Sequence, residues 1–147
     1  MKRLVGIDPG ETTGMVFTVL TEEMLLTKMT AVQAKTIEDV LAHLDEWQPD
    51  VIIMESFRLY PWTAKSLSWN QMLPSQVIGA VKAWAIGKNV EIIMQPASVR
   101  IISKPYTRRF EKLPIFKGKP HAKDAMRHIG YYLIKNCPQV LLKEVDT

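Results

Sequence analysis

Three acidic residues occupy positions in the sequence, at the ends of apolar runs or near the start of an expected helix, where their carboxylates could bind a metal ion. Asp8 follows an apolar run and opens an Asp-Pro-Gly turn, and Glu55 ends the apolar run that begins at Val51. Asp124 follows His121 by three residues, and side chains at this spacing share one face of a helix. Neighbouring carboxylates repel each other unless a cation lies between them. The pattern therefore predicts one acidic metal site assembled from three distant segments.

The chemistry that such a site suits is phosphodiester hydrolysis. Two divalent ions about 3.5–4 Å apart can activate a water molecule and stabilise the leaving oxygen, and hard divalent ions prefer oxygen ligands. We expect Mg²⁺ or Mn²⁺, with two ions per active site. Imidazole is a less natural ligand for Mg²⁺ than carboxylate is. Because His121 is one of the expected ligands, we expect Mn²⁺ to support activity at least as well as Mg²⁺.

Each of these residues also has a purely structural interpretation. Asp8 precedes Pro9 and Gly10, and aspartate commonly begins such turns. Glu55 on its own could be the solvent-facing end of a strand. His121 and Asp124 could be favoured at the start of a helix by capping and by the helix dipole. Only their joint occurrence favours a catalytic site.

The hydrophobic pattern predicts a single α/β domain over residues 1–147. Strands are expected at 3–8, 14–20, 24–29, 51–54 and 90–94. Helices are expected at 36–48, 75–88, 96–102 and 120–136, with a loop at 103–119. The first three strands would form a meander, and the later strands would pair in parallel through helical crossovers. The predicted architecture is a mixed five-stranded sheet flanked by helices.

Composition narrows the classes of protein that the chain could represent. It has 147 residues, of which 47% are hydrophobic, which suffices for one core. The single cysteine excludes an internal disulfide and a cysteine-rich zinc module. The apolar run after the N-terminus is too short for a signal peptide, and no later run reaches membrane-spanning length. We expect a soluble, cytoplasmic protein with no membrane partner.

The charge distribution suggests a polyanionic partner. Residues 1–57 carry four basic and ten acidic side chains, whereas residues 58–147 carry fifteen basic and five acidic ones. Cations next to an acidic site would hold DNA phosphates without reading sequence. Aromatic rings just after Glu55 could stack on unpaired bases at a branch point. The residues expected to contact DNA are Arg100, Lys104, Arg108, Arg109, Lys117, Lys119, Phe57 and Tyr60. Alternatively, the basic residues could belong to a solvated loop with no DNA contact, and the aromatic rings could be buried in the core.

Five segments together resemble, in order and over nearly the whole chain, the RuvC-type Holliday-junction resolvases of the RNase H-like superfamily. These segments are Gly6–Gly10 with Thr13-Gly14, Glu55 with Phe57, Gln76 with Gly79-Ala80, Pro96–Arg100, and His121–Ala125. The compact length is similar to that of phage members. The resemblance implies an RNase H-like nuclease domain.

The resemblance also implies an activity and its residues. It implies a homodimeric, metal-dependent crossover junction endodeoxyribonuclease that nicks opposed strands of four-way DNA junctions during recombination and repair. The family's four catalytic, metal-binding positions fall on Asp8, Glu55, His121 and Asp124; the third is an acid in some members and histidine in others. Its basic residue near the scissile phosphate falls on Arg100, and its wedge position falls on Phe57. The helix at 75–88 is the candidate dimer interface, both by this resemblance and by its apolar face, although that face could equally be internal.

Two other functions remain open from the sequence. The same metal site would serve a broader nuclease acting on branched DNA, flaps or RNA–DNA hybrids. Alternatively, the chain could be a non-catalytic DNA-binding scaffold whose carboxylates only stabilise the fold.

Overall fold

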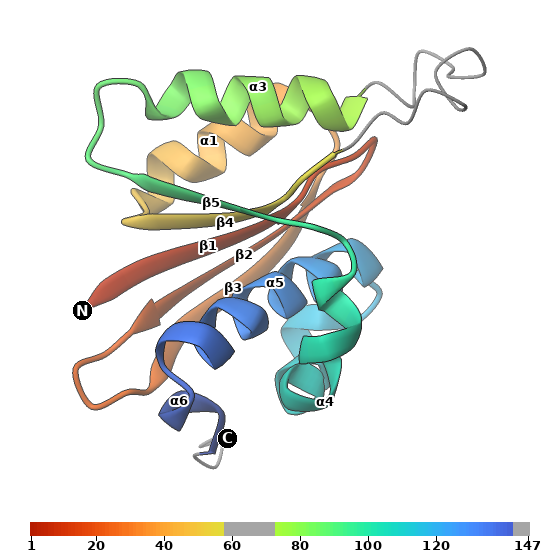
Figure 1. The fold of residues 1–147 in the computed structure, drawn as a ribbon. Coiled ribbons are helices and arrows are strands. Elements are labelled where there is room, and N and C mark those ends of the chain that lie inside the picture. The colour runs from red at the N-terminus through yellow and green to blue at the C-terminus, as the bar shows by residue number, and fades with distance from the viewer. Residues whose placement is uncertain (58–72, 143–147) are drawn as a thin grey trace.

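The computed structural model describes residues 1–57 and 73–142, which form a sheet enclosed between two layers of helices (Figure 1). The strands are β1 (Lys2–Asp8), β2 (Thr13–Leu20), β3 (Leu26–Ala34), β4 (Val51–Glu55) and β5 (Glu91–Gln95). Their order in the sheet is β3-β2-β1-β4-β5. The first three strands pair antiparallel, whereas β4 pairs in parallel with both β1 and β5. The predicted mixed α/β sheet is therefore confirmed.

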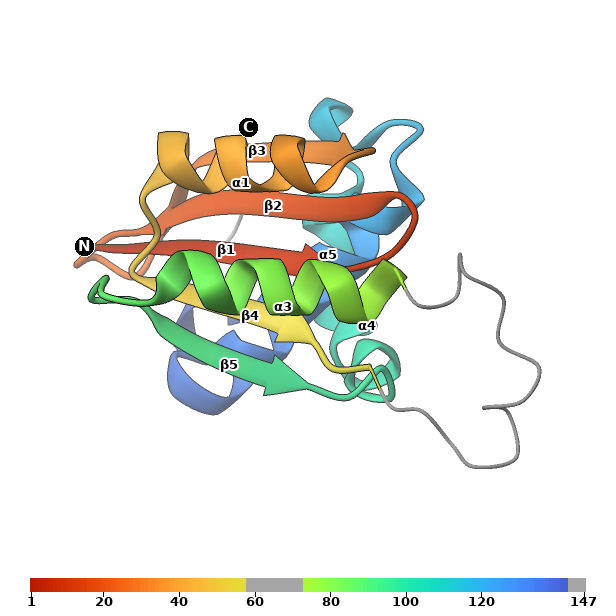
Figure 2. The ribbon, with the colours of Figure 1, turned by 90° about the horizontal axis from the view of Figure 1, so that it is seen from above.

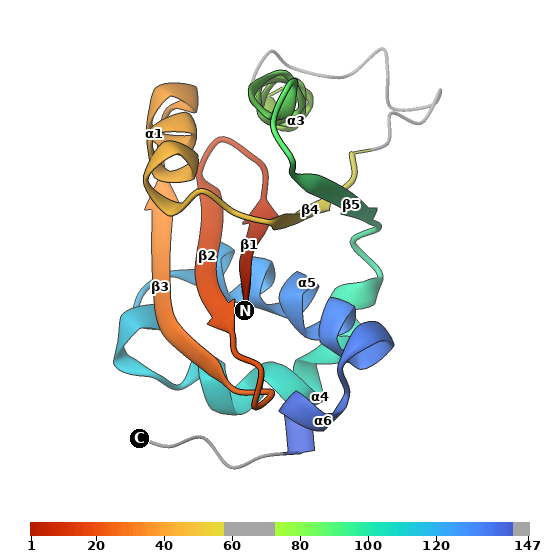
Figure 3. The same cartoon turned by 90° about the vertical axis from the view of Figure 1, so that its left-hand side faces the viewer.

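The helices divide between the two faces of the sheet. Helices α1 (Ile37–Trp47) and α3 (Leu73–Ala85) cover one face and lie over the strands when seen from above (Figure 2). Helices α4 (Val99–Glu111), α5 (Pro120–Asn136) and α6 (Gln139–Leu142) lie on the other face, as the end view shows (Figure 3). A 3₁₀ turn, Pro114–Phe116, connects α4 to α5. Within residues 1–57 and 73–142, no helix has the length and apolar character needed to cross a membrane.

The alternation of side chains along the central strands creates a core on each face of the sheet. Ile52 and Met54 of β4 pack in the cluster that includes α1 and α3, whereas Val51 and Ile53 pack in the cluster that includes α5. Because successive side chains on a strand point to opposite faces, Glu55 shares the α5 face with Ile53. Both central strands therefore direct their last residue toward α5.

The predicted start of α1 is confirmed. The Asp39 backbone N–H donates to Thr36 Oγ1 at 3.1 Å, which satisfies one of the unpaired N–H groups of the first turn. The helix ends at Gln48, which adopts a left-handed conformation with φ of 46°. This helix begins directly after β3, which runs to Ala34 rather than ending at the predicted residue 29. The strand is longer because its polar residues lie at the sheet edge, where an apolar run is not required.

The prediction of a loop at residues 103–119 was wrong for residues 103–111. Helix α4 does not end at residue 102 but continues to Glu111, and Ser103, Thr107 and Phe110 are its buried face. Pro105 lies inside the helix on the exposed side. Proline has no N–H to donate to the carbonyl of Ile101, but that residue is exposed, so water can replace the missing bond. Lys104, Arg108 and Arg109 therefore lie on a helix, whereas Lys112, Lys117 and Lys119 follow its end.

Candidate metal centre

The carboxyl ends of β1 and β4 meet at one edge of the sheet. These strands pair in parallel up to Ile7 opposite Met54, so Asp8 and Glu55 follow as neighbours. Glu55 is in turn paired with Gln95 at the end of β5. The hydroxyl of Thr13 donates to the Gly10 carbonyl at 3.2 Å and thereby closes the turn that follows Asp8. Two carboxylates and one amide therefore form a short polar row that faces α5.

Helix α5 brings the third segment to this row because glycine allows it to approach closely. A Cβ atom on Gly14, which pairs with Asp8 across β1 and β2, would lie 2.0 Å from the carbonyl oxygen of His121. Any larger residue would push the first turn of α5 away from the sheet. The helix start is also held from β3, since the His121 backbone N–H donates to Gln33 Oε1 at 2.9 Å.

Three of the four predicted metal-binding residues form a compact group. Ligand atoms of Asp8, His121 and Asp124 all lie within 4.8 Å of one another, and His121 Nδ1 is 3.4 Å from Asp8 Oδ2. Glu55 lies beside this group, and its carboxylate is close to Asp8, Arg100 and His128. Two carboxylates and an imidazole are donors that fit a divalent ion such as Mn²⁺ or Mg²⁺.

Asp8 lies in a buried environment next to two other carboxylates, which disfavours its charged form. Burial, a hydrogen bond with Glu55 and the negative charges of Glu55 and Asp124 raise the pKa of Asp8 to about 9. At neutral pH the pKa of about 9 keeps Asp8 protonated in the metal-free protein, as the donor in its hydrogen bond with Glu55. A divalent ion would replace this proton and remove the repulsion between the carboxylates. The donor set thus fits a metal site on electrostatic grounds as well.

Glu55 behaves in the opposite way. Burial alone would raise its pKa, but the nearby His128 imidazole and the hydrogen bond from protonated Asp8 outweigh burial and lower the pKa of Glu55 to about 2. His128 is fully buried, with Nε2 3.4 Å from Glu55 Oε2 and Nδ1 2.8 Å from Gln95 Oε1. Neither His128 nor Gln95 was among the site residues predicted from the sequence. The available signal was that His128 lies four residues after Asp124, on the same face of α5.

Two arginines contact the Asp124 carboxylate. Arg100 Nη1 is 2.9 Å from Asp124 Oδ2, and its Nη2 is 3.6 Å from Glu55 Oε1. Arg127 Nη1 donates to Asp124 Oδ1 at 2.8 Å. Arg100 was predicted to lie near the site and does so, whereas Arg127 was missed although it follows Asp124 by three residues. The acidic group is therefore bordered by cations on the α4 side.

The other predicted DNA-contacting residues fall into three groups. Lys104, Arg108 and Lys117 are exposed and free to meet a phosphate. Arg109 and Lys119 instead donate to backbone carbonyls of the protein, at 3.0 Å and 2.9 Å respectively, and so stabilise the fold. Phe57 is half-buried just beyond Glu55, and Tyr60 lies outside the described residues.

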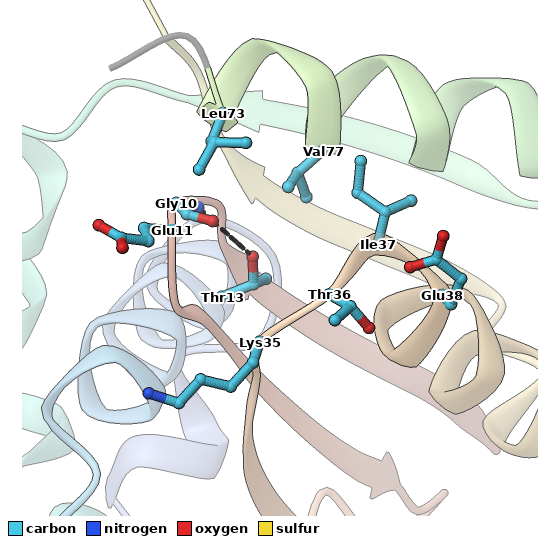
Figure 4. A pocket seen from close by; sticks show the side chains of 9 residues that line it. All are labelled: Gly10, Glu11, Thr13, Lys35, Thr36, Ile37, Glu38, Leu73 and Val77. Carbon is cyan, nitrogen blue, oxygen red and sulfur yellow. Dashed lines mark hydrogen bonds between the residues drawn. The ribbon is translucent and has the colours of Figure 1, made fainter. Parts of the chain in front are cut away.

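A separate cavity of about 230 Å³ lies on the opposite face of the sheet (Figure 4). Its walls come from the β1–β2 turn, the start of α1 and the start of α3, and they are Gly10, Glu11, Thr13, Lys35, Thr36, Ile37, Glu38, Leu73 and Val77. It contains none of the predicted metal-binding residues. The cavity is therefore not part of the candidate centre.

Comparison with known proteins identifies the fold. No protein-family model matches the chain, and no curated protein matches it significantly. Among solved structures, RuvC of T. thermophilus in complex with Holliday junction substrate is 16% identical, with 91% of this chain and 96% of that chain covered and a TM-score of 0.57. Fowlpox virus resolvase with Holliday junction DNA is also 16% identical, with 96% and 99% covered and a TM-score of 0.59. The chain thus shares the RNase H-like fold of these two proteins.

Proposed function

We propose that this protein is a divalent-metal-dependent endonuclease that resolves four-way DNA junctions by paired phosphodiester hydrolysis. The observation that carries the proposal is the convergence of Asp8, His121 and Asp124 within 4.8 Å, next to Glu55. Support comes from the fold, because two proteins with a similar fold were solved with Holliday junction DNA.

The four residues have distinct parts in the proposal. Asp8, His121 and Asp124 would hold one divalent ion, and Asp8 with Glu55 would hold a second. The bound ions would supply an activated water and charge stabilisation for the departing deoxyribose oxygen. Arg100, which borders the carboxylates and whose side chain is 32% exposed, would bind the phosphate that is cut.

Exposed cations of α4 and of the segment after it extend the surface from the site toward DNA. Lys104, Arg108 and Lys117 would bind the phosphates of a duplex arm, with a steep dependence on salt and little dependence on sequence. Phe57 follows Glu55 by two residues and would stack on a base at the branch point. These contacts would position the branch point over the carboxylates.

Resolution of a junction requires two cuts, and a homodimer would supply two equivalent sites. The apolar face of α3 that suggested an interface is not available, because Val77 and Val81 are buried against the sheet. The outer face of α3 remains our proposed contact, since Gly79 has open space around it and Ile86, which directly follows the helix, is 79% exposed. Sedimentation of the protein with and without junction DNA tests this part.

The decisive assay uses a synthetic four-way junction labelled on each strand in turn. We expect paired, symmetric nicks with Mg²⁺ or Mn²⁺, no cleavage with chelator, and no cleavage by Asp124→Asn although that variant still binds the junction. A flap and an RNA–DNA hybrid serve as parallel substrates. Preferential cleavage of either one would contradict junction resolution, and cleavage that survives in Asp124→Asn would assign the activity to another site or a contaminant.

A further inference from the structure

The two arginines on Asp124 differ in how they are held. Arg127 Nη2 donates to Glu111 Oε1 at 2.8 Å, while Arg127 Nη1 bonds Asp124 at the same distance. Glu111 is held in turn, since the Thr107 hydroxyl donates to its Oε2 at 2.6 Å. The Glu111 side chain is only 9% exposed, and Thr107 is fully buried. Arg127 is therefore fixed from both sides between α4 and α5.

Arg100 has no comparable anchor among the described residues. Apart from the carboxylates of the site, the only hydrogen bond that its side chain makes to the described residues is from Nε to the carbonyl of Ala97, just before α4, at 3.2 Å. Its contact with Glu55 is long, at 3.6 Å. Its side chain is 32% exposed, compared with 20% for Arg127. Arg100 can therefore exchange a carboxylate for a phosphate, whereas the bond from Arg127 Nη2 to Glu111 keeps the Arg127 guanidinium beside Asp124.

We propose that Arg127 is a positioning residue that fixes the Asp124 carboxylate for metal binding, and that Glu111 and Thr107 act through Arg127. This inference rests on the proposed function only in treating Asp124 as a metal ligand. Arg127 lies on α5 with Asp124, while Glu111 and Thr107 belong to α4, so the bridge also fixes the register between these helices. Substitution of a residue that orients a metal ligand commonly weakens metal affinity about 10–100-fold.

The test compares variants that keep charge or size. Arg127→Lys keeps the positive charge but loses the planar fork that reaches two carboxylates at once. Glu111→Gln keeps the size of the side chain but removes the charge that holds Arg127. Ser103→Ala is the matched control, because Ser103 is also buried between α4 and α5 and donates to the Arg127 backbone carbonyl at 2.6 Å without joining the ion pairs.

Three measurements separate positioning from other roles. Mn²⁺ affinity is measured by titration without DNA, junction affinity in EDTA by a binding assay, and cleavage in a single turnover at low and high Mn²⁺. We expect Arg127→Lys and Glu111→Gln to weaken Mn²⁺ binding at least about tenfold. Excess Mn²⁺ should restore most of the cleavage rate, and junction affinity should be retained. Ser103→Ala should match the unsubstituted protein in all three.

The proposal has clear contrary results. If Arg127→Lys weakens junction binding as strongly as Arg100→Lys does, Arg127 is a DNA contact. If Mn²⁺ affinity is unchanged, or falls equally in Ser103→Ala, the bridge only stabilises the fold. Failure of the proposed function would give a different result. If Mn²⁺ binding depends on Asp124 and Arg127 but the protein leaves junctions intact, the resolvase function is refuted and the positioning role of Arg127 is retained.

Discussion

Replacement of Asp8 by asparagine should stabilise the metal-free protein while abolishing its activity. Asp8 holds a proton in the folded state because burial and the nearby charges of Glu55 and Asp124 raise its pKa to about 9 from 3.8. An asparagine amide retains a hydrogen-bond donor for Glu55 but has no proton to lose. The substitution therefore removes the electrostatic cost of the site without removing its hydrogen bond.

The sign of the effect follows from proton linkage. Below pH about 4 the Asp8 carboxyl is protonated in both the folded and the unfolded chain, so it adds no pH dependence. Between pH 4 and pH 9 only the folded chain keeps the proton, and the free energy of unfolding falls by 1.36 kcal/mol per pH unit. By pH 7 this amounts to about 4 kcal/mol. Glu55, whose pKa is lowered to about 2, acts in the opposite direction, and its contribution is lost only as the pH falls below 4.5.

Thermal unfolding in EDTA from pH 5 to pH 8 measures this effect. We expect Asp8→Asn to be more stable than the unsubstituted protein by about 2–4 kcal/mol at pH 7, which corresponds to an increase in Tm of about 5–10 °C for a chain of this length. The difference should grow with pH, and Mn²⁺ should raise the Tm of the unsubstituted protein much more than that of the variant. Glu22→Gln, at an exposed turn, is the charge-matched control. A variant that is less stable than the unsubstituted protein, with the same pH slope, would refute the raised pKa of Asp8.

Three further predictions concern the helices around the site. Gly14→Ala should lower the free energy of unfolding by about 1–3 kcal/mol and weaken Mn²⁺ binding, because the added Cβ would meet the start of α5. Gly79→Ala, in open space on α3, should do neither. Equal effects in both variants would contradict the close packing of α5. His128→Ala should slow single-turnover cleavage about 10–100-fold and leave junction affinity in EDTA unchanged, because it removes the imidazole next to Glu55. An unaltered cleavage rate would show that His128 only fills the core. Lys104→Glu and Arg108→Glu should each reduce the salt dependence of junction binding by about one unit of slope, with unchanged Mn²⁺ affinity; an unchanged slope would remove α4 from the DNA surface.

The sequence predicted the sheet and the residues that its strands present. Apolar runs ending at Asp8 and Glu55 correctly marked two adjacent strand ends, because buried parallel strands need continuous apolar segments. Helical spacing correctly marked the helix that carries His121 and Asp124. These features are local, so one stretch of sequence contains the whole signal.

The sequence did not predict α4 or the residues that support the carboxylates. The buried face of α4 includes Ser103 and Thr107, whose small polar side chains leave no apolar period, and Pro105 interrupts the helical pattern. The partners of Glu111 and Gln95 lie 16 and 33 residues away in sequence, on α5. Such pairs depend on the packing of helix against helix and helix against strand, which no local pattern specifies.

The most direct test of the account is the position of bound metal. A crystal of the protein soaked in Mn²⁺, with diffraction measured for its anomalous signal, should show a peak within coordination distance of Asp8, His121 and Asp124. The same experiment on Asp124→Asn should give a weakened or absent peak. A strong peak elsewhere, with none between β1 and α5, would contradict the claim that these distant segments form one metal centre.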